Sequence, residues 1–449
     1  MGDTQMQSFA RNPKARTKRF GSHLALAIAL ISGGAVATVA LEAPAQAQKD
    51  KEKKEAKADY SKGFIEVYQP FAKRLEAQED PAALKAEIPT LLGAAQTADD
   101  KLVAGQAIYT IGARSEDTAL QRQGVEMMLE SGKVSAADQG RMAFAAGQLA
   151  YQAEDWTAAR ARFEQAIAGG FETANAQGLI AETYFSEGNH AAGLDFLMQA
   201  ITAQEEAGQP IDENWIQRGF AIAYNNQLPE QATTFSRLYV THYPSSDVWG
   251  DAIAVQRSFY DYDDQALLDL MRLAERTDSL RSERDYVDYI AAADPRRLPA
   301  EVGRVIDAGL AANMLKQGDV LVTEAKATTQ AQTASARADL PELESDARAS
   351  GANALLATAA GDMYLNFEQP AKAEEMYQLA LTRPDVDTAR ALTRLGIAQA
   401  DQGKFAEAKA TFDKVEGTRA PIADLWALYA QAQASGGASP APAAQTPAQ

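Results

Sequence analysis

Two side chains that carry much of protein chemistry are almost missing from this sequence. It has no cysteine and only three histidines in 449 residues. The missing thiols exclude disulfides, thiolate metal sites, a cysteine nucleophile and a lipid anchor attached to cysteine. His23 lies in the N-terminal segment, so His190 and His242 remain, and two are too few for a histidine-based metal cluster. We therefore expect no metal and no cofactor.

Familiar catalytic motifs are also missing. The sequence has no Gly-x-Ser-x-Gly elbow and no glycine-rich phosphate loop behind a strand, and no segment has the alternating pattern of a strand. The densest acidic cluster, Asp261–Asp264, lacks the glycine turn and the distal glutamate of a calcium loop. We interpret it as a solvated turn between helices, and we expect no catalytic residues and no enzyme activity.

An excess of positive charge is missing as well. The formal net charge is −18, and it becomes −21 without residues 1–47, which carry five basic and two acidic residues. Nucleic-acid binding requires concentrated lysine and arginine to displace counterions, and attraction to anionic lipid requires the same. The composition therefore excludes nucleic acid as an expected partner, and the acidity favours solubility.

The N-terminus carries the chain's one long apolar run. A basic region, 11–19, precedes apolar residues 24–41, and the small-x-small triplet 45–47 follows them. This order is typical of a secretory signal peptide. We predict cleavage before Gln48 and a soluble periplasmic protein with no stable membrane insertion. An uncleaved membrane anchor is the alternative, and the export route stays open.

A repeating pattern occupies residues 143–201. Five positions recur 34 residues later, namely Gly147 with Ala181, Ala150 with Tyr184, Ala159 with Gly193, Ala166 with Ala200, and Ile167 with Ile201. A fixed period of this length predicts a solenoid of stacked helix pairs. A single pair cannot bury its own apolar face, so its stability comes from stacking.

The first clear unit shows how such a pair is built. Residues 141–152 and 157–168 have helical periodicity. Gly147 and Ala159 are small, so the two backbones can approach closely. We expect Trp156, Phe163 and Ile167 to fill the space between neighbouring pairs.

This arrangement resembles the tetratricopeptide repeat family, whose units place small and aromatic residues at fixed positions. The match is best near the C-terminus, where one unit has Gly361, Tyr364, Ala373, Tyr377 and Ala380, and the next has Gly396, Phe405, Ala408 and Phe412. The resemblance implies an all-α, helix-turn-helix repeat solenoid. It says little about function, because members of the family bind very diverse partners.

Composition divides the chain into six segments. They are residues 1–47 (signal peptide), 48–59 (mixed-charge spacer), 60–317 (degenerate to clear helical repeats), 318–350 (Ala-, Thr- and Gln-rich), 351–434 (C-terminal repeats with a closing helix) and 435–449 (a tail predicted to be disordered). Residues 318–350 form either a polar helical bridge broken near Pro341 or a flexible linker.

The functional surface implied by the resemblance is the groove lined by the first helix of each pair. Arg390 and Arg394 occupy groove positions of the last unit and lie four apart, on one helix face. They could bind a carboxylate, but pairing with Asp387 or Asp362 is the competing interpretation. The tyrosines at or beside the first aromatic position complete the set of candidate partner-binding residues: Tyr151, Tyr184 and Tyr364.

For a second basic group, the preferred interpretation is that its arginines pair with nearby acids. The alternative is that they form a binding site for a partner. The group consists of Arg281, Arg284, Arg296 and Arg297, near Asp285, Asp288 and Asp294. The sequence thus predicts an exported scaffold for protein or peptide partners in a bacterial envelope. Two alternatives stay open, a structural component of an envelope or export assembly and a cell-wall glycan-binding protein. Oligomeric state is not predicted.

Overall fold

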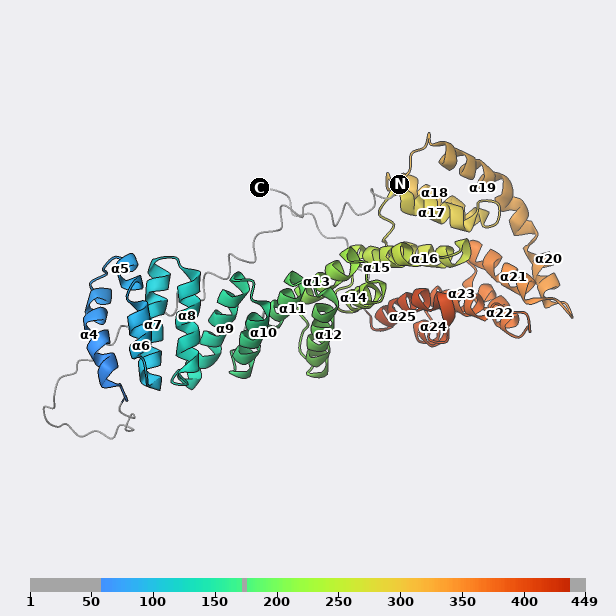
Figure 1. Ribbon diagram of the computed structural model, residues 1–449. Helices are drawn as coiled ribbons and strands as arrows, with labels where there is room; N and C mark the ends of the chain where they lie inside the picture. The colour runs from blue at the N-terminus through green and yellow to red at the C-terminus, as the bar shows by residue number, and fades with distance from the viewer. Residues whose placement is uncertain (1–57, 172–175, 437–449) are drawn as a thin grey trace. The chain divides into compact units, whose positions relative to one another are not determined.

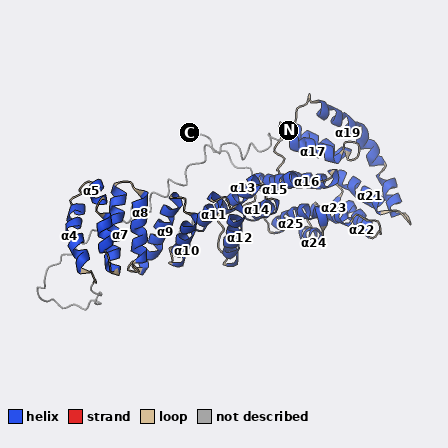
Figure 2. Ribbon diagram, in the orientation of Figure 1, coloured by secondary structure: helices blue, strands red, loops and turns tan. Residues whose placement is uncertain are grey.

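The computed structural model describes residues 58–171 and 176–436. The predicted signal peptide, all but the last two residues of the charged spacer, and the tail from 437 onward lie outside these ranges. Within them the regular structure is entirely helical, with α-helices α4 to α25, one short 3-10 helix and no strand (Figure 2). Consecutive helices pack as pairs, which confirms the predicted all-α helical-repeat fold. The chain forms two compact units, Met1–Ala200 and Ile201–Gln449, called unit 1 and unit 2 below.

Unit 1 is a stack of helices in chain order (Figure 1). Its helices are α4 (Lys62–Glu76), α5 (Pro81–Lys85), α6 (Ile88–Ala94), α7 (Ala98–Arg114), α8 (Thr118–Glu130), α9 (Ala136–Gln152), α10 (Trp156–Ala168) and α11 (Ala176–Ser186), and α12 (His190–Glu206) crosses into unit 2. Helix α7 packs on α8 and α9 on α10, and α8–α9 and α10–α11 contacts join successive pairs. Each pair therefore meets its neighbours in sequence.

Short polar side chains set where these helices begin. Thr97 and Asp100 form a reciprocal capping box at the start of α7. Asp155 caps α10 by accepting a hydrogen bond from Ala158 N. Such caps satisfy backbone N–H groups that the first helical turn leaves without partners. They separate the helices sharply enough for tight turns between them.

The turn inside each clear pair repeats one backbone feature. Glu154, Gly188, Glu368 and Gly403 each follow a first helix, and each has a positive φ, of 57°, 85°, 56° and 75°. Glycine adopts this left-handed conformation without steric cost, which explains its use at two of the four turns. The equivalent turns show that the repeat is structural as well as a pattern in the sequence.

A glycine in the first helix packs against an aromatic ring in the second, 16 residues later. A Cβ added to Gly147 would lie 2.6 Å from Phe163, one on Gly361 would lie 2.6 Å from Tyr377, and one on Gly396 would lie 2.4 Å from Phe412. These separations are far shorter than van der Waals contact, so only glycine fits. The prediction that the three glycines lie at helix crossings is confirmed.

The prediction for the large side chains of the first unit is right only in part. Phe163 is fully buried, and Trp156 packs edge-on against Tyr151 with ring centroids 5.0 Å apart. Ile167 is 38% exposed, so the expectation that it fills the space between pairs is wrong.

Unit 2 continues with helix pairs. Its helices are α13 (Glu213–Asn225), α14 (Pro229–His242), α15 (Ser246–Phe259), α16 (Asp264–Arg276), α17 (Glu283–Ala293), α18 (Pro299–Ala311), α19 (Val320–Ala338), α20 (Leu340–Arg348), α21 (Ala354–Asn366), α22 (Pro370–Leu381), α23 (Thr388–Ala400), α24 (Phe405–Phe412), the 3-10 helix η2 (Gly417–Arg419) and α25 (Ala420–Ala434). Helices α19 and α20 occupy the Ala-, Thr- and Gln-rich stretch. The helical conformation is interrupted between them at Asp339, which ends α19 and precedes α20.

Unit 2 differs from a simple stack because its C-terminal helices pack against its earlier ones. Helix α25 contacts α14 and α16, α23 contacts α16, and α21 contacts α18. Figure 1 shows α16 running beside α23 and α25. The first helices of the C-terminal pairs, α21 and α23, are thus covered by helices of the same chain.

Candidate functional site

The side chains of unit 2 with the most unusual chemistry form a buried ionic cluster around Asp269 of α16. Its carboxylate accepts hydrogen bonds from Arg394 Nε of α23 at 3.0 Å and from Arg419 Nη1 of η2 at 2.6 Å. Arg272 Nη1, one turn further along α16, lies at 3.3 Å. Asp269 and Arg394 are both 0% exposed. One carboxylate therefore ties α16 to the C-terminal helices.

Asp362 of α21 forms the second centre of this cluster. It accepts hydrogen bonds from Arg394 Nη1 at 2.6 Å, from Arg390 Nη2 at 2.9 Å and from the Tyr377 hydroxyl at 2.8 Å. Burial alone would raise the pKa of Asp362, but the charges of Arg394 and Arg390 hold it below the usual value. The carboxylate is therefore ionised, and its oxygens are already occupied.

Glu301 of α18 forms the third centre. Arg272 Nε and Nη2 each lie 2.8 Å from its carboxylate oxygens, in the bidentate geometry that favours this pair. Burial opposes ionisation, yet the charge and hydrogen bonds of Arg272 lower the pKa of Glu301 to about 2. The Tyr289 hydroxyl donates to Glu301 at 3.0 Å, and burial raises the pKa of that phenol well above its ordinary value.

This arrangement suits a role in holding helices together rather than a role in proton transfer. A general base needs an acceptor that is free to reach a substrate, whereas Asp269, Asp362 and Glu301 are ionised or fully hydrogen-bonded and almost inaccessible to solvent. Removing one partner of a buried ion pair leaves an uncompensated charge, which costs about 3–5 kcal/mol. The cluster therefore fastens α16, α18, α21, α23 and η2 together, and η2 leads directly into α25.

The structure places the two candidate groove arginines differently from the exposed site that the sequence predicts. Arg394 is completely buried, so the expectation that it faces an open groove is wrong. The physical reason is that α16 covers α23, and Asp269 takes the place of an external carboxylate. Arg390 keeps 19% of its side chain exposed and pairs with Asp362, as the competing interpretation predicts.

The third candidate of unit 2, Tyr364, is also covered. Only 5% of it is exposed, and its hydroxyl donates a hydrogen bond to Glu344 of α20. Burial and the neighbouring carboxylate raise the pKa of Tyr364 to about 12. Its hydroxyl is therefore committed to an internal contact.

The two candidate tyrosines of unit 1 are only half-buried. The Tyr151 hydroxyl lies 3.0 Å from Ser186 Oγ, which belongs to the next pair. The guanidinium of Arg160 lies over the Tyr184 ring, 4.3 Å from its centroid, in a cation–π contact. Both rings remain at the surface, at the junction of two successive pairs.

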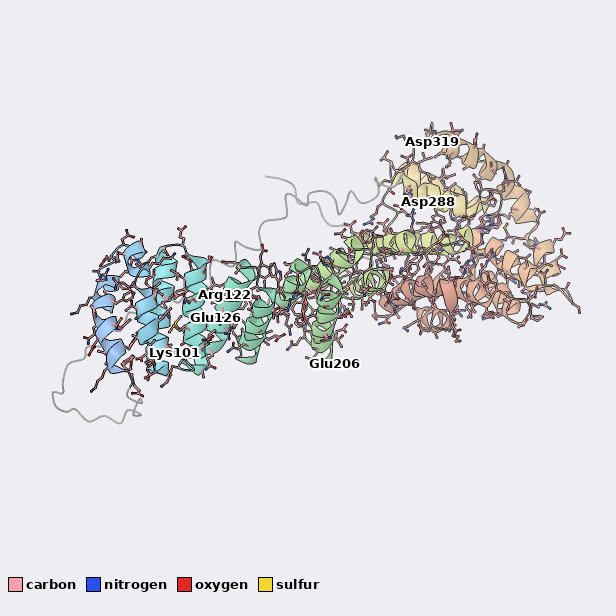
Figure 3. The ribbon with its side chains drawn as sticks, viewed as in Figure 1. Lys101, Arg122, Glu126, Glu206, Asp288 and Asp319 are labelled. Atoms are coloured by element: carbon pink, nitrogen blue, oxygen red, sulfur yellow. The ribbon has the colours of Figure 1, made fainter. Side chains whose placement is uncertain are left out.

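Unit 1 also has two surface hollows. One lies between α7 and α9, where Leu102, Met128 and Met142 supply apolar lining and Lys133 and Arg141 supply charge. The other lies between α8 and the α9–α10 turn and is lined by Arg122, Glu126 and Ala153 among others. Figure 3 labels Arg122 and Glu126 on α8. Both hollows lie where one helix pair meets the next.

The second basic group is paired only in part. Arg281 contacts Asp251 at 3.0 Å, and Arg284 lies 3.4 Å from Asp288. Among the described residues, Arg296 and Arg297 form no ion pair; Arg297 Nη2 donates instead to the carbonyl of Ala292 at 3.1 Å. The prediction of pairing with Asp285, Asp288 or Asp294 thus holds for Arg284. The guanidinium of Arg281 pairs with Asp251 instead, and Arg296 and Arg297 form no such ion pair among the described residues.

The acidic cluster at 261–264 lies in the turn between α15 and α16. Asp263 is 72% exposed at its side chain and caps α16 by accepting from Ala266 N at 2.7 Å. Over residues 58–171 and 176–436, no group of three or more His, Cys, Asp or Glu side chains is placed to hold a metal ion. The interpretation of this segment as a solvated turn agrees with this geometry.

The sequence interpretation missed Asp269, Arg272 and Glu301. A signal was present, because Asp269 and Arg272 are opposite charges three apart inside the apolar run Leu267 to Ala274. Charged residues on the apolar face of a helix are rarely buried without partners. Their distant partners could not be identified from the pattern alone.

Comparison with known proteins found no match, either to the models of protein families or among curated protein sequences. In the described part of the chain, no helix combines the length and the apolar character needed to cross a membrane.

Proposed function

We propose that this protein is an exported helical-repeat scaffold that binds protein or peptide partners in the bacterial cell envelope. The observation that carries the proposal is a difference between two equivalent surfaces. In unit 2, α16 and α18 cover the first helices of the C-terminal pairs. In unit 1, the first helices α7 and α9 border an open hollow.

The lining of this hollow supports a peptide as the ligand. Met142 and Leu102 are partly exposed, and Met128 lies beneath them with 3% exposure. Methionine side chains adapt to partners of different shape, and a charged rim helps to fix their orientation. Lys133 and Arg141, which pair with Asp99 and Asp138, provide such a rim together with Asp138 itself.

The resemblance to tetratricopeptide repeats supports the same proposal. Equivalent left-handed turns and glycine–aromatic contacts recur from pair to pair. Solenoids of this kind present extended surfaces for binding partners. Export is proposed from the basic, apolar and small-x-small order of residues 1–47.

Affinity purification of the mature protein from its native cells tests the binding surface. We expect Met142→Glu to lose the partners that the wild-type protein recovers, because a charge in the apolar lining opposes burial of a ligand. Glu164→Lys, at an exposed position of α10, is the control and should retain them. Full recovery by a folded Met142→Glu protein would remove this hollow from the proposal.

The same purification distinguishes other roles. Stoichiometric recovery of a membrane protein would instead indicate a component of an envelope assembly. Retention on purified peptidoglycan sacculi without other proteins would indicate a glycan-binding protein. N-terminal sequencing and cell fractionation test export, for which we expect a mature chain that begins near Gln48 in the soluble periplasmic fraction.

A further inference from the structure

At the centre of the ionic cluster of unit 2, guanidinium groups outnumber carboxylates. At its edge, Arg276 is paired with Glu275 and Asp401, and the Tyr289 hydroxyl links Glu275 to Glu301. Three buried acids, Asp269, Glu301 and Asp362, serve four arginines, Arg272, Arg390, Arg394 and Arg419. The largely exposed Asp263 lies 3.6 Å from Arg419 and offsets only that residue. Arg297 is a fifth arginine, and it has no acidic partner among the described residues.

Arg297 lies in the loop between α17 and α18, in an unfavourable electrostatic setting. Its Nε is buried and forms no hydrogen bond. Burial lowers the pKa of Arg297, and the charges of Arg394 and Arg390 lower it further, although Asp362 opposes them. A cation held beside other cations costs folding free energy unless a further negative charge is supplied.

Two other buried donors around the same cluster lack acceptors within the described part of the chain. Arg390 donates one bond to Asp362, but its Nε has no partner. Asn366, one turn beyond Asp362 on α21, is fully buried, and its Nδ2 has no partner either. Its Oδ1 accepts from Glu301 N in the first turn of α18 at 2.8 Å, which places the amide beside the helix that begins two residues after Arg297.

Nothing in the cluster can supply the missing acceptor. Asp362 already accepts hydrogen bonds from Arg390, Arg394 and Tyr377. Buried donors without partners are rare in folded proteins, and each one calls for an explanation such as an unseen ion. The N-terminus of α18 adds partial positive charge to the same region, because Leu298 provides no side-chain cap there.

We propose that Arg297, Arg390 and Asn366 form a binding site for an oxyanion, supplied as the carboxylate or phosphate group of a small ligand. Guanidinium and amide N–H groups are the donors that such oxygens accept. Arg297 and Arg390 are both partly exposed, although their Nε atoms and Asn366 Nδ2 are buried. This site is separate from the hollow of unit 1, and its existence does not depend on the proposed function.

Thermal unfolding of the mature protein tests the proposal, with sodium phosphate and sodium acetate as the two probes and sodium chloride at matched ionic strength as the reference. A ligand that binds only the folded state raises the melting temperature in a saturable way. We expect saturable stabilisation beyond that in chloride from one of the two probes. The one that acts identifies the source of the oxyanion.

Arg297→Gln provides the decisive variant, and Arg284→Gln on α17 removes the same charge at a 61% exposed side chain as its control. We expect Arg297→Gln, without probe, to melt at the wild-type temperature or higher, because the repulsion is relieved. Its affinity for the probe should fall at least about tenfold, since a charge-assisted hydrogen bond contributes about 1.5–3 kcal/mol. Arg284→Gln should respond to the probe like the wild type.

Three results would overturn the proposal. The first is a wild-type protein that responds to both probes only as it does to chloride. The second is an Arg297→Gln protein that keeps the full saturable response. The third is a clear loss of stability in Arg297→Gln without any probe, which would show that the arginine has a structural role.

Discussion

Unit 1 and unit 2 contain the same kind of helix pair, but their polar contacts span very different distances along the chain. In unit 1, Arg122 reaches Asp155, 33 residues away, and Arg162 reaches Glu126, 36 residues away. In unit 2, Asp269 binds Arg394 across 125 residues and Arg419 across 150. The first separations are about one repeat, whereas the second join α16 to helices near the C-terminus of unit 2.

This difference determines how each unit should unfold. In a stack, stability is approximately a sum of terms for each repeat and for each interface between neighbours, so one end can open alone. In unit 2 the C-terminal helices cannot leave α16 without separating Arg394 and Arg419 from the buried carboxylate of Asp269. We therefore infer that unit 1 opens locally and that unit 2 opens as one cooperative body.

The largest predicted effect comes from Asp269→Asn. This change leaves Arg394 and Arg419 facing a neutral amide in a site closed to solvent, and breaking such a pair costs about 3–5 kcal/mol. Hydrogen exchange measured by mass spectrometry should show α16, α18, α21, α23 and α25 losing protection together, while α7 to α10 keep theirs.

Glu126→Gln in unit 1 is the matched control for that experiment. Glu126 and its partner Arg162 keep 21% and 25% of their side chains exposed. Pairs in contact with solvent contribute about 0–1 kcal/mol, so protection should change little. Loss of protection in α21 and α23 without loss in α16 would contradict the cooperative unit.

The repeated features are the part of this structure that a single sequence predicts. Gly361 and Tyr377 lie 16 residues apart on facing helices, and the same spacing recurs at Gly396 and Phe412. Such contacts depend on residues within one pair, where helical periodicity fixes which faces meet. The helix pairs and the glycine crossings are therefore predictable from the amino-acid sequence alone.

The closure of unit 2 could not be predicted in this way. Arg394 lies at a repeat position that is expected to face an exposed groove. It is buried because α16 packs against α23, and its partner on α16, Asp269, lies 125 residues earlier in the sequence. A local pattern contains no information about which distant segment covers a face. The sequence consequently predicts the wrong exposure for Arg394, and it does not identify Asp269 as the partner of this arginine.

The next effect concerns acid. The pKa of Glu301 is lowered to about 2 from an ordinary 4.5, so its stabilisation is present above pH 4.5 and is lost as the pH falls toward 2. This contribution is roughly 3 kcal/mol.

Burial raises the pKa of Asp251 to about 6 from 3.8, although Arg281 opposes the rise. Protonation of Asp251 therefore stabilises the fold as the pH falls from about 6 toward 4.

The two shifts together predict that the stability of unit 2 passes through a maximum between pH 4 and 5, near the ordinary pKa values of these acids. Chemical denaturation at a series of pH values, followed by hydrogen exchange, measures this profile. Asp251→Asn should remove the rise on the alkaline side, and Glu301→Gln should flatten the fall on the acid side. A stability that decreases steadily from pH 7 would rule out this account of Asp251.

A smaller effect follows from overpacking. Leucine at Gly361 or at Gly147 would collide with the ring of Tyr377 or Phe163, at a cost of about 1–3 kcal/mol or more. Gly361→Leu should weaken all of unit 2, and Gly147→Leu only the helices next to α9. Gly93→Ala in α6 is the control, because nothing lies within 4 Å of the added methyl group, and it should stabilise by about 0.5–1 kcal/mol.

The smallest predicted effect is the coupling between Glu126 and Arg162, which tests whether the contacts of unit 1 are as weak as their exposure implies. A double-mutant cycle with Glu126→Gln and Arg162→Gln isolates this term. Both side chains remain in contact with water, so the charges are screened and each loses conformational freedom when the pair forms. We expect a coupling below about 1 kcal/mol that shrinks further as salt is raised.

The corresponding cycle at Asp269 and Arg394, both fully buried, should give a larger coupling that responds little to salt. Equal couplings in the two cycles would show that burial does not distinguish the units, and the local opening of unit 1 would then need another cause.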